Sequence, residues 1–204
     1  MNRKLTRRSW MGAAGTARMA AAMGTLGVAQ DANAATAGSA ASSPARLQGG
    51  DVIQPQRVLP VLHRTDVLVV GGGPAGVCAA LAAKRTGAAV TLVERYGHFG
   101  GQWTGGLVLI VAGVHDKTNK QVTRGIGEEM LARLDKLDHG VIPRRPGVDP
   151  TIDAEAAKYV MVEMLTEAQV DVFLHCWGVD AIVDGDTVKG AVFESKSGRQ
   201  AILA

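Results

Sequence analysis

The sequence predicts an α/β protein in which a parallel sheet of βαβ units is followed by a small antiparallel β-meander. Residues 67–70 and 89–93 are continuous apolar runs, typical of parallel strands buried on both faces, and a helical pattern of Ala and Leu over 77–86 separates them. Gly87 ends that helix. Near the C-terminus, three alternating runs are joined by turns that contain Gly185 and Gly198, which is typical of a meander. These runs are residues 178–183, 187–194 and 199–203.

Composition predicts a single folded domain over residues 61–204. Residues 35–60 are rich in Ala, Ser, Gly and Pro and show no apolar period, so we expect a disordered linker there. Residues 1–34 carry a net charge of +4, which leaves −1 for the rest of a chain whose total is +3. The basic pI therefore comes from the leader, and nucleic acid is excluded as a partner.

Residues 1–34 have the basic, apolar and small-residue order of a cleaved signal peptide. The segment from Thr6 to Met11 resembles the twin-arginine motif, with Trp10 where Phe is usual. The resemblance implies the twin-arginine export machinery as a partner, a mature chain that begins near Ala35, and a periplasmic or secreted protein. The alternative is a basic tail that is never cleaved. No stretch is long and apolar enough to remain in a bilayer.

A glycine motif follows the first strand at once. Gly71 permits a tight turn, Gly73 lets a pyrophosphate approach the backbone, and Gly76 lets the helix pack closely on the sheet. The helix N-terminus offers unpaired N–H groups to phosphates. Glu94 ends the second strand, where its carboxylate can accept both ribose hydroxyls and repel a 2′-phosphate. This order, a strand, the glycine motif, a helix, a second strand and an acid, predicts a Rossmann-like dinucleotide site. The alternative is a glycine-rich turn with only a structural role.

FAD and NAD both contain ADP, so the motif alone does not distinguish them. The glycine-rich loop that follows Glu94, from Arg95 to Gly106, does. It is similar to the E-R-x-G-x-x-G-G segment of FAD-dependent oxidoreductases of the glutathione-reductase-like superfamily, closest to the subgroup related to fumarate reductase flavoproteins. The similarity extends from about Pro60 to the end of the chain. It implies FAD as the cofactor, with contacts at Gly71, Gly73, Pro74, Ala75, Gly76, Glu94, Arg95, Gly100, Gly101, Gln102, Thr104 and, at the adenine, Val179. Some relatives attach FAD covalently through a histidine near this loop, but we interpret His98 as a solvated loop residue.

Residues 107–174 are expected to form two helices, a third strand of the parallel sheet and the segments that connect them. Apolar spacing predicts a helix over 126–138, and Asp153 is expected to cap a helix whose inner face includes Met161 and Leu165. Residues 170–174 predict a third buried strand beside the first two. Residues 107–114 are expected to form a strand or a buried crossing loop, and residues 141–152 a loop. Neither the cysteines nor the histidines have metal-ligand spacing, so no metal is expected.

The resemblance implies an FAD-dependent oxidoreductase that acts on an unknown small-molecule substrate and an unknown electron acceptor. In the family, a second flavin-contacting segment and the substrate region follow the meander, so we expect a chain truncated at its C-terminus, with the catalytic residues beyond residue 204 and no turnover by these 204 residues. We also expect a bare edge strand near Leu203. The alternative is a stand-alone or decayed nucleotide-binding module without catalysis.

Overall fold

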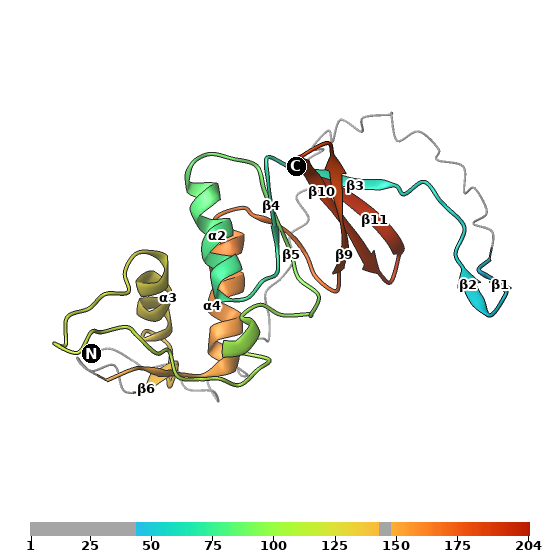
Figure 1. The fold of residues 1–204 in the computed structure, drawn as a ribbon. Helices are drawn as coiled ribbons and strands as arrows, with labels where there is room; N and C mark the ends of the chain where they lie inside the picture. The colour runs from blue at the N-terminus through green and yellow to red at the C-terminus, as the bar shows by residue number, and fades with distance from the viewer. Residues whose placement is uncertain (1–43, 143–147) are drawn as a thin grey trace, which may run out of the picture. The chain divides into compact units, whose positions relative to one another are not determined.

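A computed structural model describes residues 44–142 and 148–204, and the predicted signal peptide at residues 1–34 lies outside this range (Figure 1). The chain divides into two units between residues 56 and 57. Within the described range, no helix has the length and hydropathy required to cross a bilayer.

The described part of the first unit contains one hairpin. Strands β1 (Arg46–Gln48) and β2 (Asp51–Ile53) pair in antiparallel fashion. Gly49 and Gly50 form the two-residue turn with φ of +63° and +94°, a conformation that glycine adopts without steric cost. All side chains of the hairpin are exposed. The predicted linker therefore contains a local hairpin with a Gly-Gly turn, and the side chains of this hairpin are not buried in a hydrophobic core.

The second unit is built on a three-stranded parallel sheet. Strands β4 (Val67–Val70), β5 (Val90–Val93) and β8 (Asp171–Phe173) lie in the order β4-β5-β8. Val67 is opposite Val90, and Thr91 is opposite Asp171. The three strands and their parallel pairing agree with the prediction. The third strand was expected to be buried, but β8 is an edge strand that contacts only β5, and Asp171 and Val172 are exposed.

Helices cover one face of this sheet. Helix α2 (Pro74–Arg85) packs on β4 and β5, α4 (Ala154–Glu167) lies beside α2, and α3 (Ile126–Leu134) packs on both helices (Figure 1). Asp153 caps α4 as predicted, because its Oδ1 accepts a hydrogen bond of 2.7 Å from the Ala156 N–H. The principal core lies between the helices and the sheet and includes Val77, Leu81, Leu92, Met130, Leu134, Met161 and Leu165.

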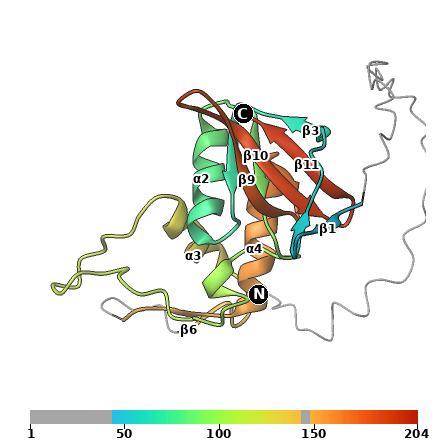
Figure 2. The same ribbon diagram turned by 45° about the vertical axis from the view of Figure 1, so that its right-hand side comes forward.

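The predicted meander forms a four-stranded sheet on the other face (Figure 2). Strands β9 (Trp177–Asp184), β10 (Thr187–Ser195) and β11 (Gly198–Leu203) are antiparallel neighbours, and β3 (Val61–Arg64) pairs with β11 in parallel. A second core beneath this sheet joins Val93, Phe193 and Ile202 to Leu68 and Phe173 of the parallel strands.

The expectation of an unpaired edge near Leu203 is wrong. The order β3-β11-β10-β9 makes β11 an inner strand, and the Leu203 carbonyl accepts a hydrogen bond of 3.0 Å from the Thr65 N–H. The four residues of β3 are distant in sequence from their partner, so local pattern did not reveal the pairing.

The segments between α2 and α4 are largely irregular. Residues 107–114, for which we predicted a strand or a buried loop, form an irregular segment with Val111 and Val114 buried and Leu107 and Ile110 exposed. Strands β6 (Val141–Ile142) and β7 (Thr151–Ile152) pair the two ends of the predicted 141–152 loop.

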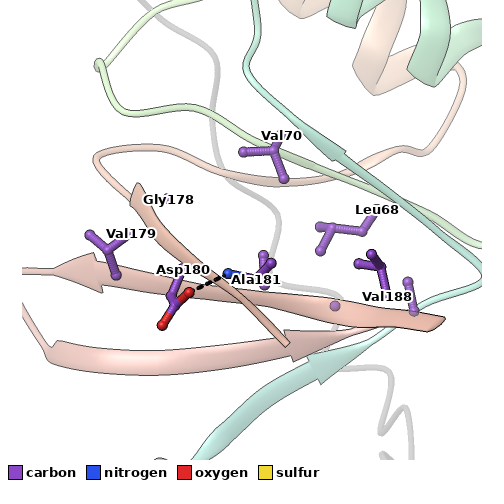
Figure 3. Close-up of a pocket in the computed structure, with 10 residues that line it drawn as sticks. Leu68, Val70, Gly178, Val179, Asp180, Ala181 and Val188 are labelled. Carbon is purple, nitrogen blue, oxygen red and sulfur yellow. Dashed lines mark hydrogen bonds between the residues drawn. The ribbon is translucent and has the colours of Figure 1, made fainter. Parts of the chain in front are cut away.

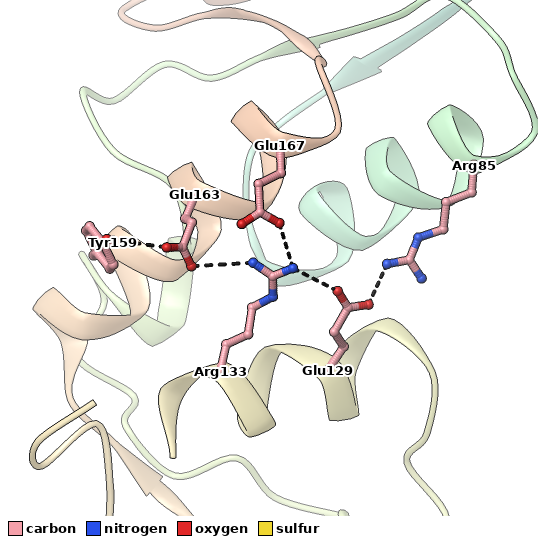
Figure 4. A network of polar contacts seen from close by, with 6 residues as sticks. All are labelled: Arg85, Glu129, Arg133, Tyr159, Glu163 and Glu167. Atoms are coloured by element: carbon pink, nitrogen blue, oxygen red, sulfur yellow. Dashed lines mark hydrogen bonds and ion pairs between the residues drawn. The ribbon is translucent and has the colours of Figure 1, made fainter. Parts of the chain in front are cut away.

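A network of ion pairs joins the three helices (Figure 4). Arg133 of α3 reaches Glu167 of α4 at 2.7 Å and Glu163 at 3.4 Å, and it also contacts Glu129 one turn earlier at 3.2 Å. Glu129 in turn pairs with Arg85 of α2. Arg85 holds the pKa of Glu129 below its ordinary value, with a further contribution from Arg133, and Arg133 likewise lowers the pKa of Glu167.

Replacing Arg133 by Met should lower the free energy of unfolding by roughly 0.5–1 kcal/mol at pH 7, the scale of exposed ion pairs. Because the carboxylate pKa values are lowered by folding, this contribution is present above the unfolded glutamate pKa of about 4.3 and is lost as pH falls through the folded values. Urea unfolding of both proteins should therefore give a difference that disappears in acid. Lys158→Met, which removes only an exposed pair with Glu155, is the matched control. A difference independent of pH would contradict the ionic role of Arg133.

Candidate functional site: a dinucleotide cleft

The site lies where the chain leaves the carboxyl ends of the parallel strands. After β4, Gly71 turns the chain with φ of +105°, and its N–H donates to the Val93 carbonyl at 2.7 Å. Helix α2 begins directly at Pro74, which has no N–H to leave unpaired at that position. The first amides of α2 therefore emerge at the edge of the sheet, where open α/β sheets bind their ligands.

The other two glycines of the motif have different steric surroundings. A Cβ at Gly76 would lie 1.9 Å from the Gly71 carbonyl oxygen, so any larger residue would displace the turn. A Cβ at Gly73 would meet nothing within 4 Å. Gly76 is thus required for packing within the protein, whereas the surface of Gly73 is open for a ligand to approach.

Glu94 connects the glycine turn to the loop that follows β5. Its side chain is only 7% exposed. Oε2 accepts a hydrogen bond of 2.6 Å from the Gly72 N–H, and Oε1 accepts one of 2.9 Å from the Tyr96 N–H. A carboxylate can accept about four hydrogen bonds, so two acceptor positions remain for a ligand. The sequence identified this acid but not its two backbone partners.

The glycine-rich loop lies directly on the turn. The Gly100 N–H donates to the Gly72 carbonyl at 2.8 Å, and a Cβ at Gly101 would lie 3.2 Å from the Gly73 Cα. The short 3₁₀ helix η1 (Gly101–Trp103) follows directly after Gly100. The structure thus brings Gly71, Gly73, Gly100 and Gly101 together, and their contact with FAD stays a prediction.

Thr104 is buried within the loop. It is 1% exposed, and its hydroxyl donates to the Phe99 carbonyl at 2.7 Å. The side chain therefore closes the loop from inside, and the contact of this residue with FAD stays a prediction. His98 is also more engaged than the solvated residue we expected, because it is partly buried and its ring stacks on Tyr96 with centroids 5.7 Å apart.

Two clefts flank Arg95. The first, of about 240 Å³, is lined by Glu94, Arg95, Trp177 and Gly178, with Val70, Gly71, Val93 and Cys176. The second, of about 480 Å³, lies on the loop side and is lined by Arg95, Tyr96, His98, Gly101, Gln102, Gly105 and Gly106. The predicted residues Gly71, Glu94, Arg95, Gly101 and Gln102 all line one of them.

Val179 does not line either cleft. It lies in a neighbouring apolar cavity of about 510 Å³, beside Leu68, Val70 and Val188 (Figure 3). The residues beside Glu94 are instead Cys176, Trp177 and Gly178, at the start of β9. Sequence reasoning missed them, although their position directly after the third parallel strand places them at the same carboxyl edge.

The cysteines and the residue types that bind metals are also possible parts of the site. Burial raises the pKa of both thiols, Cys78 and Cys176, and each is free. In the part of the chain that the structure describes, no three His, Cys, Asp or Glu side chains are grouped to hold a metal ion.

A glycine turn at a helix N-terminus, with a buried acid at the end of the next parallel strand, defines a Rossmann-like dinucleotide-binding protein. A family model described as FAD dependent oxidoreductase matches residues 66–204, and the chain belongs to this family, whose cofactor is FAD. No curated protein sequence matches the chain.

The chain is similar to several solved structures. The 3-ketosteroid-Δ4-(5α)-dehydrogenase of Rhodococcus jostii is 17% identical, with 72% of this chain and 47% of that chain covered and a TM-score of 0.50. Thermovibrio ammonificans THI4 is 22% identical, with 69% of this chain and 55% of that chain covered and a TM-score of 0.49. A flavocytochrome c3 fumarate reductase is 23% identical, with 71% of this chain and 33% of that chain covered and a TM-score of 0.46. The chain therefore spans between a third and just over half of these proteins.

The residues present are compatible with FAD. The open surface at Gly73, the remaining acceptor positions of Glu94 and the adjacent cleft are suited to a pyrophosphate, a ribose and a base, respectively. Pro74, Ala75 and the amide of Gly76 form the first turn of the helix that faces this region.

The two glycines should separate folding from binding. Gly76→Ala should destabilise the protein by about 1–3 kcal/mol, the usual cost of overpacking, because its Cβ meets the Gly71 carbonyl. Gly73→Ala should leave the urea midpoint near that of the wild type and weaken FAD binding at least tenfold, since its Cβ occupies the ligand side. Urea unfolding and isothermal titration with FAD measure the two effects. Equal behaviour of both variants would refute this division of roles.

Proposed function

We propose that this chain is the FAD-binding portion of an oxidoreductase that passes two electrons between a small-molecule substrate and a separate electron acceptor. The observation that carries the proposal is the Glu94 carboxylate, buried beside the glycine turn and directed to a cleft of nucleoside size. Bound FAD would supply the two-electron chemistry. The residues of this chain would bind and orient it.

The proposed binding mode assigns each part of the cofactor to a different element. The ribose of the ADP half bonds to Glu94, and the pyrophosphate lies on the turn from Gly71 to Gly76, where the N-terminal amides of α2 donate to it. The remaining part follows Gly100, Gly101 and Gln102 along the second cleft. Arg95 is exposed and lines both clefts, so in this binding mode it lies between the two halves of the cofactor.

Glu94 also supports a choice among dinucleotides. A buried carboxylate at the ribose repels the 2′-phosphate of NADP, and the loop packed on the turn supports FAD over NAD because it extends the binding surface beyond the ADP half. We further propose the subgroup related to fumarate reductase flavoproteins, on the E-R-x-G-x-x-G-G segment.

The cofactor assignment predicts that the 204-residue protein binds FAD and is yellow when loaded. Glu94→Ala should weaken FAD binding by about 1.5–3 kcal/mol, the scale of hydrogen bonds to charged groups. Titration calorimetry with FAD and NAD measures this, at a temperature at which circular dichroism shows the variant folded. Glu155→Ala, which removes an exposed glutamate on α4, is the control. A colourless protein that binds NAD tightly and FAD not at all would overturn the assignment.

We also propose export by the twin-arginine route, based on Arg7 and Arg8 before the mild Ala/Gly-rich stretch. This route carries folded proteins, which suits a flavoprotein loaded in the cytoplasm.

Arg7→Lys combined with Arg8→Lys should leave the precursor in the cytoplasm, because charge is kept while the arginine pair is lost. Cell fractionation and the mass of the mature N-terminus, expected near Ala35, report the result. Arg3→Lys is the matched control and should be exported normally. Efficient export of the double variant would exclude this pathway.

A further inference from the structure

Trp177 is a large aromatic side chain on the wall of the first cleft. It begins β9, an edge strand of the antiparallel sheet, and is 60% exposed. Neither the glycine motif nor the loop after Glu94 includes it. A tryptophan left in water at the mouth of a cleft offers a flat apolar surface that a planar ligand can cover.

Arg95, which also contacts Tyr96, lies over one side of this ring. The Arg95 guanidinium carbon lies 4.5 Å from the centre of the Tyr96 ring and 5.5 Å from that of the Trp177 ring. Its Nη2 also donates to the Tyr96 hydroxyl at 2.6 Å. Both separations are within the range of a cation–π contact, so Arg95 links the loop after β5 to the start of β9. The tryptophan is therefore oriented by contacts within the protein.

The cleft has the size and polarity of a nucleoside site. Its volume of about 240 Å³ is below the roughly 300–1,000 Å³ of pockets for a whole drug-sized ligand, so it accommodates part of a dinucleotide. Glu94 supplies the polar end. Val70, Val93 and Trp177 supply the apolar remainder. A sugar at the carboxylate would direct its base towards the tryptophan.

We propose that Trp177 is the residue on which the adenine of FAD stacks, and that Arg95 is a positioning residue for its ring. This rests on the proposed function, since it assumes that the cleft receives the ADP half. Stacking of a base on an aromatic side chain contributes about 1–3 kcal/mol by alanine substitution, which corresponds to an affinity change of about 5- to 150-fold. The contribution belongs to the adenosine half alone.

The test compares ADP, FAD and FMN as ligands of the wild-type 204-residue protein, Trp177→Phe and Trp177→Ala. We expect ADP to quench a part of the tryptophan fluorescence that is absent from the Phe variant, and FMN, which lacks adenosine, to bind Trp177→Ala as tightly as it binds the wild type. Trp177→Ala should weaken ADP and FAD binding by a similar factor in the range above, and Trp177→Phe should largely restore it. Arg95→Met should weaken both less than Trp177→Ala does.

Structural damage is separated from lost stacking by the urea midpoint without ligand, which should be close to that of the wild type for Trp177→Phe. If ADP and FAD bind Trp177→Ala as tightly as they bind the wild type, the proposal for Trp177 is wrong while the FAD assignment stands. If the wild type binds neither ADP nor FAD, the proposed function itself fails, and the inference fails with it.

Discussion

The carboxylate of Glu94 is the interaction on which the site depends. A charged group that is 7% exposed costs free energy unless hydrogen bonds replace its water, and here the amides of Gly72 and Tyr96 do so from opposite loops. The same two bonds fix the glycine turn against the loop after β5. Because one side chain carries both connections, the position of the turn, the mouth of the cleft and the direction of the free acceptor positions are determined together.

The two cores explain why the site is at one edge of the sheet. Val69 and Leu92 face the helices, whereas Leu68 and Val93 face the antiparallel sheet, as the alternation of a strand requires. With both faces covered, the carboxyl ends of β4 and β5 are the surface left for a ligand. The loops that leave these ends carry the glycine turn, Glu94 and Arg95, so the functional residues gather without any of them lying in the core.

The family match and the cleft concern the binding of FAD, which is a separate property from the choice of substrate. In the proposed binding mode, the turn, the buried acid and the first cleft would engage only the ADP half, and the second cleft, on the loop side, would receive the rest of the cofactor. Helix α2, whose N-terminus would meet the pyrophosphate, is held at its other end by the ion pair between Arg85 and Glu129 of α3.

The sequence by itself determined the features that depend on neighbours in the chain. The apolar runs predicted β4, β5 and β8, glycine spacing predicted the turn, and Asp153 predicted the cap of α4, since period and capping are local properties. Only the tertiary structure decided which distant groups meet. It paired β3 with β11, buried Thr104 within its loop, and placed Trp177 rather than Val179 beside Glu94. These contacts join residues far apart in the chain or depend on how a loop closes, and a local pattern carries no record of either.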